Sequence, residues 1–253
     1  MDAIERLVAA GGFDAVVVSG DLTQRARAGE FQRAAVFLRD LERHAPCLAV
    51  PGNHDVRWWL APMRLRRAER IYAPWRRYLE RDIEPTRSIR GVTMVGINTA
   101  QGVTPRTLTW NMRDLSVIGD LNESQLVRVK GIFEAAPRGD LRVLVMHHNP
   151  VRGELSRRHG LKRAPAMMRA IAATGAEVVC CGHDHQEAIH FVENDQLGTV
   201  VSTAGTLSDR SRGDRPSAVN VIEVSAAEIA VETLAWQHAS IGFGSTQRKC
   251  FPR

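Results

Sequence analysis

The stretch CLAVPGNHD, residues 47–55, is a short apolar run that ends in glycine, asparagine, histidine and aspartate. Four further stretches share this form, an apolar run followed at once by polar side chains: FDAVVVSGD (13–21), VTMVGINT (92–99), LRVLVMHHNP (141–150) and AEVVCCGHDH (176–185). Because nearly continuous apolar strands are typical of a sheet covered on both faces, the five runs predict buried strands.

Amphipathic helical patterns separate these runs. They cover residues 30–44, 122–136 and 165–175, and a further helix is expected at the start of the chain in DAIERLVAAGG. Strands that alternate with helices indicate an α/β fold. Open α/β sheets bind their ligands beyond the carboxyl ends of the strands. All five runs carry polar residues at that end, so we expect a single site there.

The polar residues at these strand ends form one candidate set: Asp21, Asn53, His54, Asp55, Asn98, His147, His148, His183 and His185. A carboxylate, an amide and imidazoles make a mixed oxygen and nitrogen site, which suits Mn²⁺, Fe or Zn²⁺ and lacks the thiolates of a structural zinc site. The sequence has no GxSxG, GxGxxG or P-loop motif, which disfavours serine-hydrolase and nucleotide-cofactor chemistry.

The chain changes character after residue 186. Short runs such as GTVVST and SAVNVIEVS follow one another without a helical pattern between them, which predicts antiparallel strands that complete a second sheet. The last stretch has no periodicity, and we expect it to be loosely ordered. The expected organisation is therefore one domain, residues 1–238, followed by a C-terminal tail, residues 239–253.

Composition places the chain among ordinary globular enzymes, with 44% apolar and 25% charged residues. No apolar run approaches the roughly 20 residues that a membrane helix needs, and no signal sequence is evident, so we expect a cytoplasmic protein without membrane contact. The four cysteines have no CxxC spacing. Reduced thiols in the core are the better interpretation, with Cys180 and Cys181 packing on opposite faces of a strand.

The net charge of +6 favours anionic partners. Much of the excess lies in residues 57–82, where arginines mix with tryptophan and tyrosine. One interpretation is a basic, aromatic cap over a phosphate-bearing or nucleotide substrate. The other, which we favour, is an amphipathic helical pair whose aromatics face the core and whose arginines are solvated.

Taken in order, the motifs GD (20–21), GNHD (52–55), HHNP (147–150) and GHDH (182–185) resemble those of the calcineurin-like metallophosphoesterase superfamily. Two longer stretches, VVVSGDLTQRARAGEF and VVSTAGTLSDRSRGDRPSAVNVIEV, are similar to the branch near class III cyclic-nucleotide phosphodiesterases. The resemblance covers residues 1 to about 235. It implies an α/β fold in which a mixed β-sandwich is flanked by helices, in an αββα arrangement.

The resemblance also implies two divalent metal ions, Mn²⁺, iron (Fe²⁺ or Fe³⁺) or Zn²⁺, bridged by a carboxylate and a water or hydroxide. The implied metal ligands are Asp21, Asn53, His147, His183 and His185. Asp21 would bridge the two ions and His185 would ligate one of them. The remaining three ligands would complete the shell of the other ion.

His54 would be the catalytic histidine, close to the phosphate and its leaving oxygen rather than on a metal. Asp55 would orient His54 or the loop around it. We expect Asp184 to face outward and not to act as a ligand. We interpret His148 as a packing or supporting residue.

Each assignment has a simpler alternative. Aspartate and asparagine are common in glycine-containing turns, so Asp21 and Asn53 are alternatively turn residues only. His147 is alternatively a core histidine whose hydrogen bonds are satisfied. We interpret Asn98 as a residue that stabilises its loop.

The chain departs from the superfamily in one respect. The family's first motif, Asp-x-His at the end of an opening strand, has no counterpart before the first helix, so the expected first strand is lacking and the second metal site is incomplete. One hypothesis is an upstream extension of roughly 15–25 residues, enough for a strand and a turn. The other is genuine loss of one metal site. An in-frame upstream segment that encodes the motif is expected under the first hypothesis only.

The function that we predict is metal-dependent hydrolysis of a phosphodiester, either a cyclic nucleotide or a similar small phosphodiester. The alternatives are a nuclease or a phosphomonoesterase on the same site, and a non-catalytic interaction module with an incomplete metal centre. The basic segment supports a nucleic-acid partner only weakly. The sequence leaves the identity of the metal, the physiological substrate and the oligomeric state open.

Overall fold

The computed structural model describes residues 1–253 except 62–67, 111–113, 152–159, 194–197, 208–214 and 240. Its helices are α1 (Asp2–Gly11), α2 (Ala28–Glu42), α3 (Ala73–Tyr78), α4 (Glu123–Ala135) and α5 (Ala164–Ala172). Short 3₁₀ turns occur at η1 (Asn53–Asp55), η2 (Trp58–Leu60) and η4 (Ala68–Tyr72). Each of the four helical patterns in the sequence corresponds to one of these helices, within a few residues at either end.

The largest sheet has six strands in the order β3-β4-β6-β8-β10-β9. Its strands are β3 (Thr86–Ile89), β4 (Val92–Gly96), β6 (Leu141–Val145), β8 (Val178–Cys181), β10 (Thr199–Thr203) and β9 (Ala188–Val192). The four inner strands run parallel to one another, and the two edge strands run antiparallel to them. The sheet is therefore mixed, with a parallel centre.

The remaining strands form three smaller sheets. A parallel pair joins β1 (Val16–Val18) to β2 (Cys47–Ala49), a short parallel pair joins β5 (Ile118–Gly119) to β7 (Gly160–Leu161), and an antiparallel meander contains β11 (Ala218–Val224), β12 (Glu228–His238) and β13 (Gly242–Pro252). All five strands that the apolar runs predict are present, as β1, β2, β4, β6 and β8.

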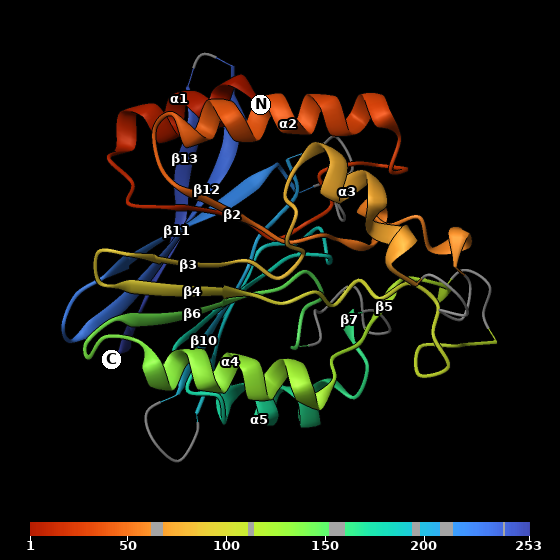
Figure 1. Cartoon of the computed structure of the whole chain (residues 1–253). Helices are drawn as coiled ribbons and strands as arrows, with labels where there is room; N and C mark the ends of the chain where they lie inside the picture. Colours follow the sequence, from red (N-terminus) through yellow and green to blue (C-terminus); the bar gives the residue numbers. More distant parts are fainter. Residues whose placement is uncertain (62–67, 111–113, 152–159, 194–197, 208–214, 240) are drawn as a thin grey trace.

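Three of the five hydrophobic clusters among the described residues lie between the layers of helices and strands that Figure 1 shows. One lies between α4, α5 and the six-stranded sheet, a second between that sheet and strands β2 and β12, and a third between α1, α2 and β2. The strand β8 shows why its sequence is continuously apolar. Val178 and Cys180 enter the second core, while Val179 and Cys181 enter the first, because successive strand residues point to opposite faces. The architecture is the expected mixed α/β sandwich flanked by helices.

The expectation of antiparallel strands in a second sheet was confirmed for β11 and β12, which form a separate antiparallel sheet with β13. It was wrong for β9 and β10: β10 pairs in parallel with β8, so both extend the main sheet. Residues 242–252 are not loosely ordered, since they form β13, which pairs along the whole length of β12. Half-buried Phe251 anchors β13 by stacking on Phe191, with ring centroids 5.2 Å apart. The strand escaped prediction because most of its side chains are exposed, which leaves no apolar alternation to detect.

Some aromatic residues of the basic segment 57–82 lie in the core, whereas others are exposed as a substrate-binding cap would require. Tyr72 and Trp75 are fully buried, as expected of core residues, whereas Trp59 is 51% exposed. The middle of the segment, residues 62–67, lies outside the described residues. Among the helices that are described, none is long and apolar enough to cross a bilayer.

The anchoring role of Phe251 can be tested by substitution. Phe251→Ala should lower the free energy of unfolding by about 2 kcal/mol, because it removes a stacked aromatic ring from the edge of the second core. The matched control is Arg248→Ala on the same strand, which loses surface ion pairs with Glu223 and Glu232 and should cost less than about 1 kcal/mol. Urea denaturation followed by circular dichroism measures both. Equal effects would show that β13 does not depend on this contact.

Candidate metal centre

Glycine residues allow the loops after β1 and β2 to approach each other closely. Strands β1 and β2 are parallel neighbours, and they end in Gly20-Asp21 and Gly52-Asn53. A Cβ atom on Gly20, which has a φ of 93°, would lie 2.6 Å from the backbone nitrogen of Gly52. A Cβ atom on Gly52 would collide with the carboxylate of Asp21. The glycines of the GD and GNHD motifs therefore let the two loops approach closely enough to share one site.

The carboxylate of Asp55 ties these loops together. Asp55 is completely buried and accepts four hydrogen bonds, from the backbone nitrogens of Gly52 (2.9 Å), Leu22 (3.2 Å) and Thr23 (2.8 Å) and from the Thr23 hydroxyl (2.9 Å). Burial and the neighbouring charge of Asp21 raise the pKa of Asp55 to about 6, although the hydrogen bonds from Gly52 and Thr23 oppose this rise. Of the two roles predicted for Asp55, the structure supports the one that orients the loop.

Asp21 and His147 form an ion pair inside the site. Oδ2 of Asp21 lies 3.4 Å from Nε2 of His147, and Oδ1 accepts a hydrogen bond of 2.9 Å from the backbone nitrogen of His54. Burial opposes ionisation of Asp21, but the charge and hydrogen bond of His147 lower its pKa to about 2. Burial likewise opposes protonation of His147, but the charge of Asp21 raises its pKa. A cation at this position would take the place of the positive charge on His147.

Three ligand atoms converge beside this pair. His147 Nε2 lies 3.0 Å from Asn53 Oδ1, and His183 Nδ1 lies 3.1 Å from each of these two atoms. The other ring nitrogen of His147 donates to the backbone oxygen of Ser19 at 2.7 Å, so in a neutral ring Nε2 presents a lone pair. Ligands on adjacent corners of an octahedral ion, each about 2.1 Å from it, lie about 3.0 Å apart. Asn53, His147 and His183 therefore fit a metal ion.

His148 is the third histidine of a cluster that could hold a metal, together with His147 and His183, but its bonding differs. Its Nδ1 lies 2.8 Å from the Thr99 hydroxyl, which also accepts a hydrogen bond from the His148 backbone. Burial and the nearby charge of His147 lower the pKa of His148 well below its usual value. A neutral ring tied to Thr99 supports the wall of the site, in agreement with the interpretation from sequence.

The GHDH motif places its two histidines differently. Both have left-handed backbones, with φ of 71° for His183 and 54° for His185, as does Asp21 with a φ of 57°. Such strained conformations in residues other than glycine gather at functional sites. The ring nitrogens of His183 join the three-histidine cluster, whereas His185 does not belong to it among the residues described.

Asp184, between these histidines, does not face outward as expected. It is 3% exposed, and it accepts a hydrogen bond of 2.9 Å from the side chain of Asn149. The bond links the loop after β8 to the loop after β6, so Asp184 supports the site from within. Asn98 is also buried and, as predicted, stabilises its loop: its side chain donates to the Tyr72 hydroxyl and accepts from the Ala100 backbone.

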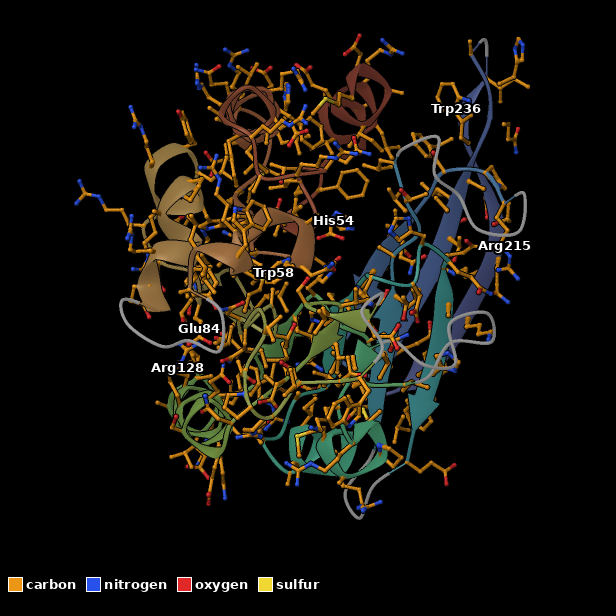
Figure 2. All side chains as sticks on the ribbon, turned by 90° about the vertical axis from the view of Figure 1, so that its right-hand side faces the viewer. His54, Trp58, Glu84, Arg128, Arg215 and Trp236 are labelled. Carbon is orange, nitrogen blue, oxygen red and sulfur yellow. The ribbon has the colours of Figure 1, made fainter. Side chains whose placement is uncertain are left out.

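His54 directly follows the candidate ligand Asn53 on the loop after β2 and is labelled in Figure 2. Its Nδ1 is 2.8 Å from the backbone oxygen of Gln24, which fixes the proton on Nδ1 and turns Nε2 away from that loop. The sequence did not reveal this partner, because any residue type supplies a backbone oxygen. His54 and Asn53 also line a cavity of about 550 Å³ that contains three arginines and two tryptophans.

A sequence model of the calcineurin-like phosphoesterases matches residues 1–187, about three quarters of the 253-residue chain. The chain belongs to this family. Members of the family usually bind divalent metals, in accord with the convergent ligand atoms of Asn53, His147 and His183. The match ends just after the GHDH motif, so it includes every candidate metal ligand.

Solved structures resemble the chain in fold at low sequence identity. GAP50, described as the anchor in the inner membrane complex of Plasmodium, is 11% identical with a TM-score of 0.56, and the match covers 99% of this chain and 82% of that one. A Vps29 single mutant from Entamoeba histolytica is 11% identical with a TM-score of 0.46, covering 99% and 89%. Vps29 from Chaetomium thermophilum is 9% identical with a TM-score of 0.44, covering 99% and 86%. No curated protein sequence gives a significant match.

The role of Asp55 as a link between loops has a measurable consequence. Asp55→Ala removes the acceptor of four buried hydrogen bonds, and it should lower the free energy of unfolding by about 3 to 5 kcal/mol. The matched control is Asp14→Asn, an exposed aspartate just before β1, which should change stability by less than about 0.5 kcal/mol. Thermal and urea unfolding test both variants. A loss below 1 kcal/mol for Asp55→Ala would contradict this role.

Proposed function

We propose that this member of the family is a metal-dependent phosphodiesterase that hydrolyses a small phosphodiester, such as a cyclic nucleotide. The convergence of Asn53 Oδ1, His147 Nε2 and His183 Nδ1 at 3.0–3.1 Å carries the proposal. Acceptor atoms do not gather this closely in a buried site unless a cation or a proton lies between them. The site adjoins a cavity large enough for an organic phosphate ester.

Each residue has a definite part in the proposal. Asn53, His147 and His183 would hold one metal ion, and Asp21 would approach it through Oδ2, since Oδ1 is occupied by the backbone of His54. His185 would belong to a second ion that shares Asp21. When bound, such ions supply Lewis acidity to the phosphate group and lower the pKa of water.

His54 would act as the general acid. The hydrogen bond to the Gln24 backbone holds its ring, and Nε2 is then the nitrogen that can donate a proton to the oxygen of the leaving group. The ring is only half-buried and borders the cavity, so a substrate can reach it. The backbone of His54 also binds Asp21, which couples the position of the acid to that of a metal ligand.

The ligand set can be tested by metal binding. Wild-type protein should bind Mn²⁺, and His147→Ala should weaken binding at least tenfold, because it removes one of the three convergent ligands. His148→Gln is the matched control, since His148 bonds to Thr99 and should affect affinity less. Isothermal titration calorimetry gives the affinities, and elemental analysis gives the number of ions per chain. An equal loss in the two variants would contradict the assignment of His148 to the wall.

The reaction can be tested with chromogenic esters. With Mn²⁺ the protein should release p-nitrophenol from bis-p-nitrophenyl phosphate, and His54→Ala should slow release by about 10² to 10⁴-fold. The control is His44→Ala, an exposed histidine on the far side of β2 from the site loops, which should leave the rate unchanged.

Other outcomes separate the alternatives. Faster turnover of p-nitrophenyl phosphate than of the diester would favour a phosphomonoesterase. Steeply salt-dependent binding and cleavage of DNA or RNA would favour a nuclease. Folded protein that binds one ion or none, and hydrolyses no ester above the His54→Ala background, would overturn the enzymatic proposal in favour of an interaction module.

A further inference from the structure

The cavity beside His54 is larger than a reacting phosphate requires. It has a volume of about 550 Å³, within the range of small-molecule sites, and its walls come from segments far apart in the chain. These are residues 24–27 before α2, residues 53–59 after β2, and residues 116–117 before β5. We call it the arginine–tryptophan cavity. Its inner end is Asn53 and His54, so a ligand that fills it would reach the candidate metal centre.

One wall of this cavity is aromatic. Trp58 and Trp59 form an edge-to-face pair with ring centroids 6.0 Å apart, and Trp58 lies next to His54 in Figure 2. The backbone of Gly102 packs closely on the base of the Trp58 side chain, because a Cβ atom on Gly102 would lie 2.9 Å from the Trp58 Cβ. Trp59 remains 51% exposed. A flat, unsaturated ring is the ligand group that such a wall binds by stacking.

Another part of the cavity wall is cationic. Arg25, Arg27 and Arg57 line the cavity, and none of the described lining residues is a carboxylate. Arg57 donates two hydrogen bonds, of 2.9 and 2.7 Å, to the backbone oxygen of Ala26, which holds the 24–27 loop against the 53–59 segment.

The other two arginines, Arg25 and Arg27, are exposed residues that line the cavity. Their backbone nitrogens each donate to Glu30 at 3.0 Å, and the charge of Arg27 also acts on this carboxylate. Guanidinium groups bind phosphate strongly. The loop therefore holds two arginines beside a cavity that already contains a third positive charge.

We propose that the arginine–tryptophan cavity binds the part of the substrate that is not hydrolysed, and that this part is a nucleoside carrying a second phosphate. The base would stack on Trp58 and Trp59, and the second phosphate would lie against Arg25 and Arg27. The inference rests on the proposed function for the position of the reacting ester at His54. It narrows that function, because a cyclic nucleotide carries one phosphate only and would leave the cationic wall unused.

Three substrates with one leaving group test the proposal. They are methyl p-nitrophenyl phosphate, p-nitrophenyl thymidine 5′-phosphate, and the same thymidine ester with a 3′-phosphate. In each, water adds to phosphorus and the bond to p-nitrophenolate breaks, leaving a phosphomonoester. The base should raise kcat/KM at least about tenfold, and the 3′-phosphate should raise it about tenfold again.

Substitutions test whether the tryptophans account for the increase in kcat/KM from the base, and the arginines for the increase from the 3′-phosphate. Trp59→Ala should reduce the kcat/KM ratio between the thymidine ester and the methyl ester. The double variant R25A/R27A should bring the ratio between the 3′-phosphorylated and unphosphorylated esters close to one. Arg33→Ala, an exposed arginine further along α2, is the control and should change neither ratio.

A binding measurement without turnover separates this inference from the proposed function. Titration of thymidine 3′,5′-bisphosphate in EDTA, followed by calorimetry and tryptophan fluorescence, should show binding that R25A/R27A weakens at least about tenfold. Such binding without hydrolysis of any ester would support the cavity and overturn the phosphodiesterase. Hydrolysis of all three esters with equal kcat/KM, or bisphosphate binding that is absent or unaffected by R25A/R27A, would overturn the cavity proposal.

Discussion

The buried carboxylate of Asp55 joins the two loops on which the site depends. By accepting from the backbones of Gly52, Leu22 and Thr23, it closes the turn after β2 upon the turn after β1. Asp21, Asn53 and His54 all lie on these two turns. A shift of either turn would separate the candidate metal ligands from the candidate acid. The hydrogen bonds that compensate for burying the Asp55 carboxylate therefore also fix the positions of the site residues on the two turns.

Close approach of backbones makes this arrangement possible. A Cβ atom on Gly20 or Gly52 would collide with its neighbours. The carboxylate of Asp21 lies where a side chain on Gly52 would be, and the ring of His147 lies where one on Gly20 would be. Asp21 and His147 follow strands of different sheets, and their side chains meet at the carboxyl ends of those strands, with Oδ2 of Asp21 3.4 Å from Nε2 of His147. The same pair of side chains marks where a cation would bind. Fold stability and ligand geometry at this end of the sandwich thus rest on one group of contacts.

One side of the site is buried and hydrogen-bonded, whereas the other side opens into a cavity. On the side of the six-stranded sheet, His148, Thr99, Asn149 and Asp184 are buried and bonded to one another in pairs. On the other side, the loop that holds the ring of His54 opens into the arginine–tryptophan cavity. A rigid inner wall and an open outer wall are what an enzyme needs if one reaction centre is to accept a particular substrate. Reactivity would then come from the inner residues, and selectivity from the loops 24–27 and 56–59.

The sequence by itself determined the α/β class, the five central strands and the residues that follow them, because apolar runs that end in polar residues need only local information. Only the tertiary structure decided that Asp184 is buried and that β10 joins the main sheet. These outcomes depend on contacts between residues far apart in the chain, such as Asn149 and Asp184, 35 positions apart. They depend also on backbone atoms, such as the Gln24 oxygen that holds His54, which every residue type possesses. No pattern of side chains could have identified them.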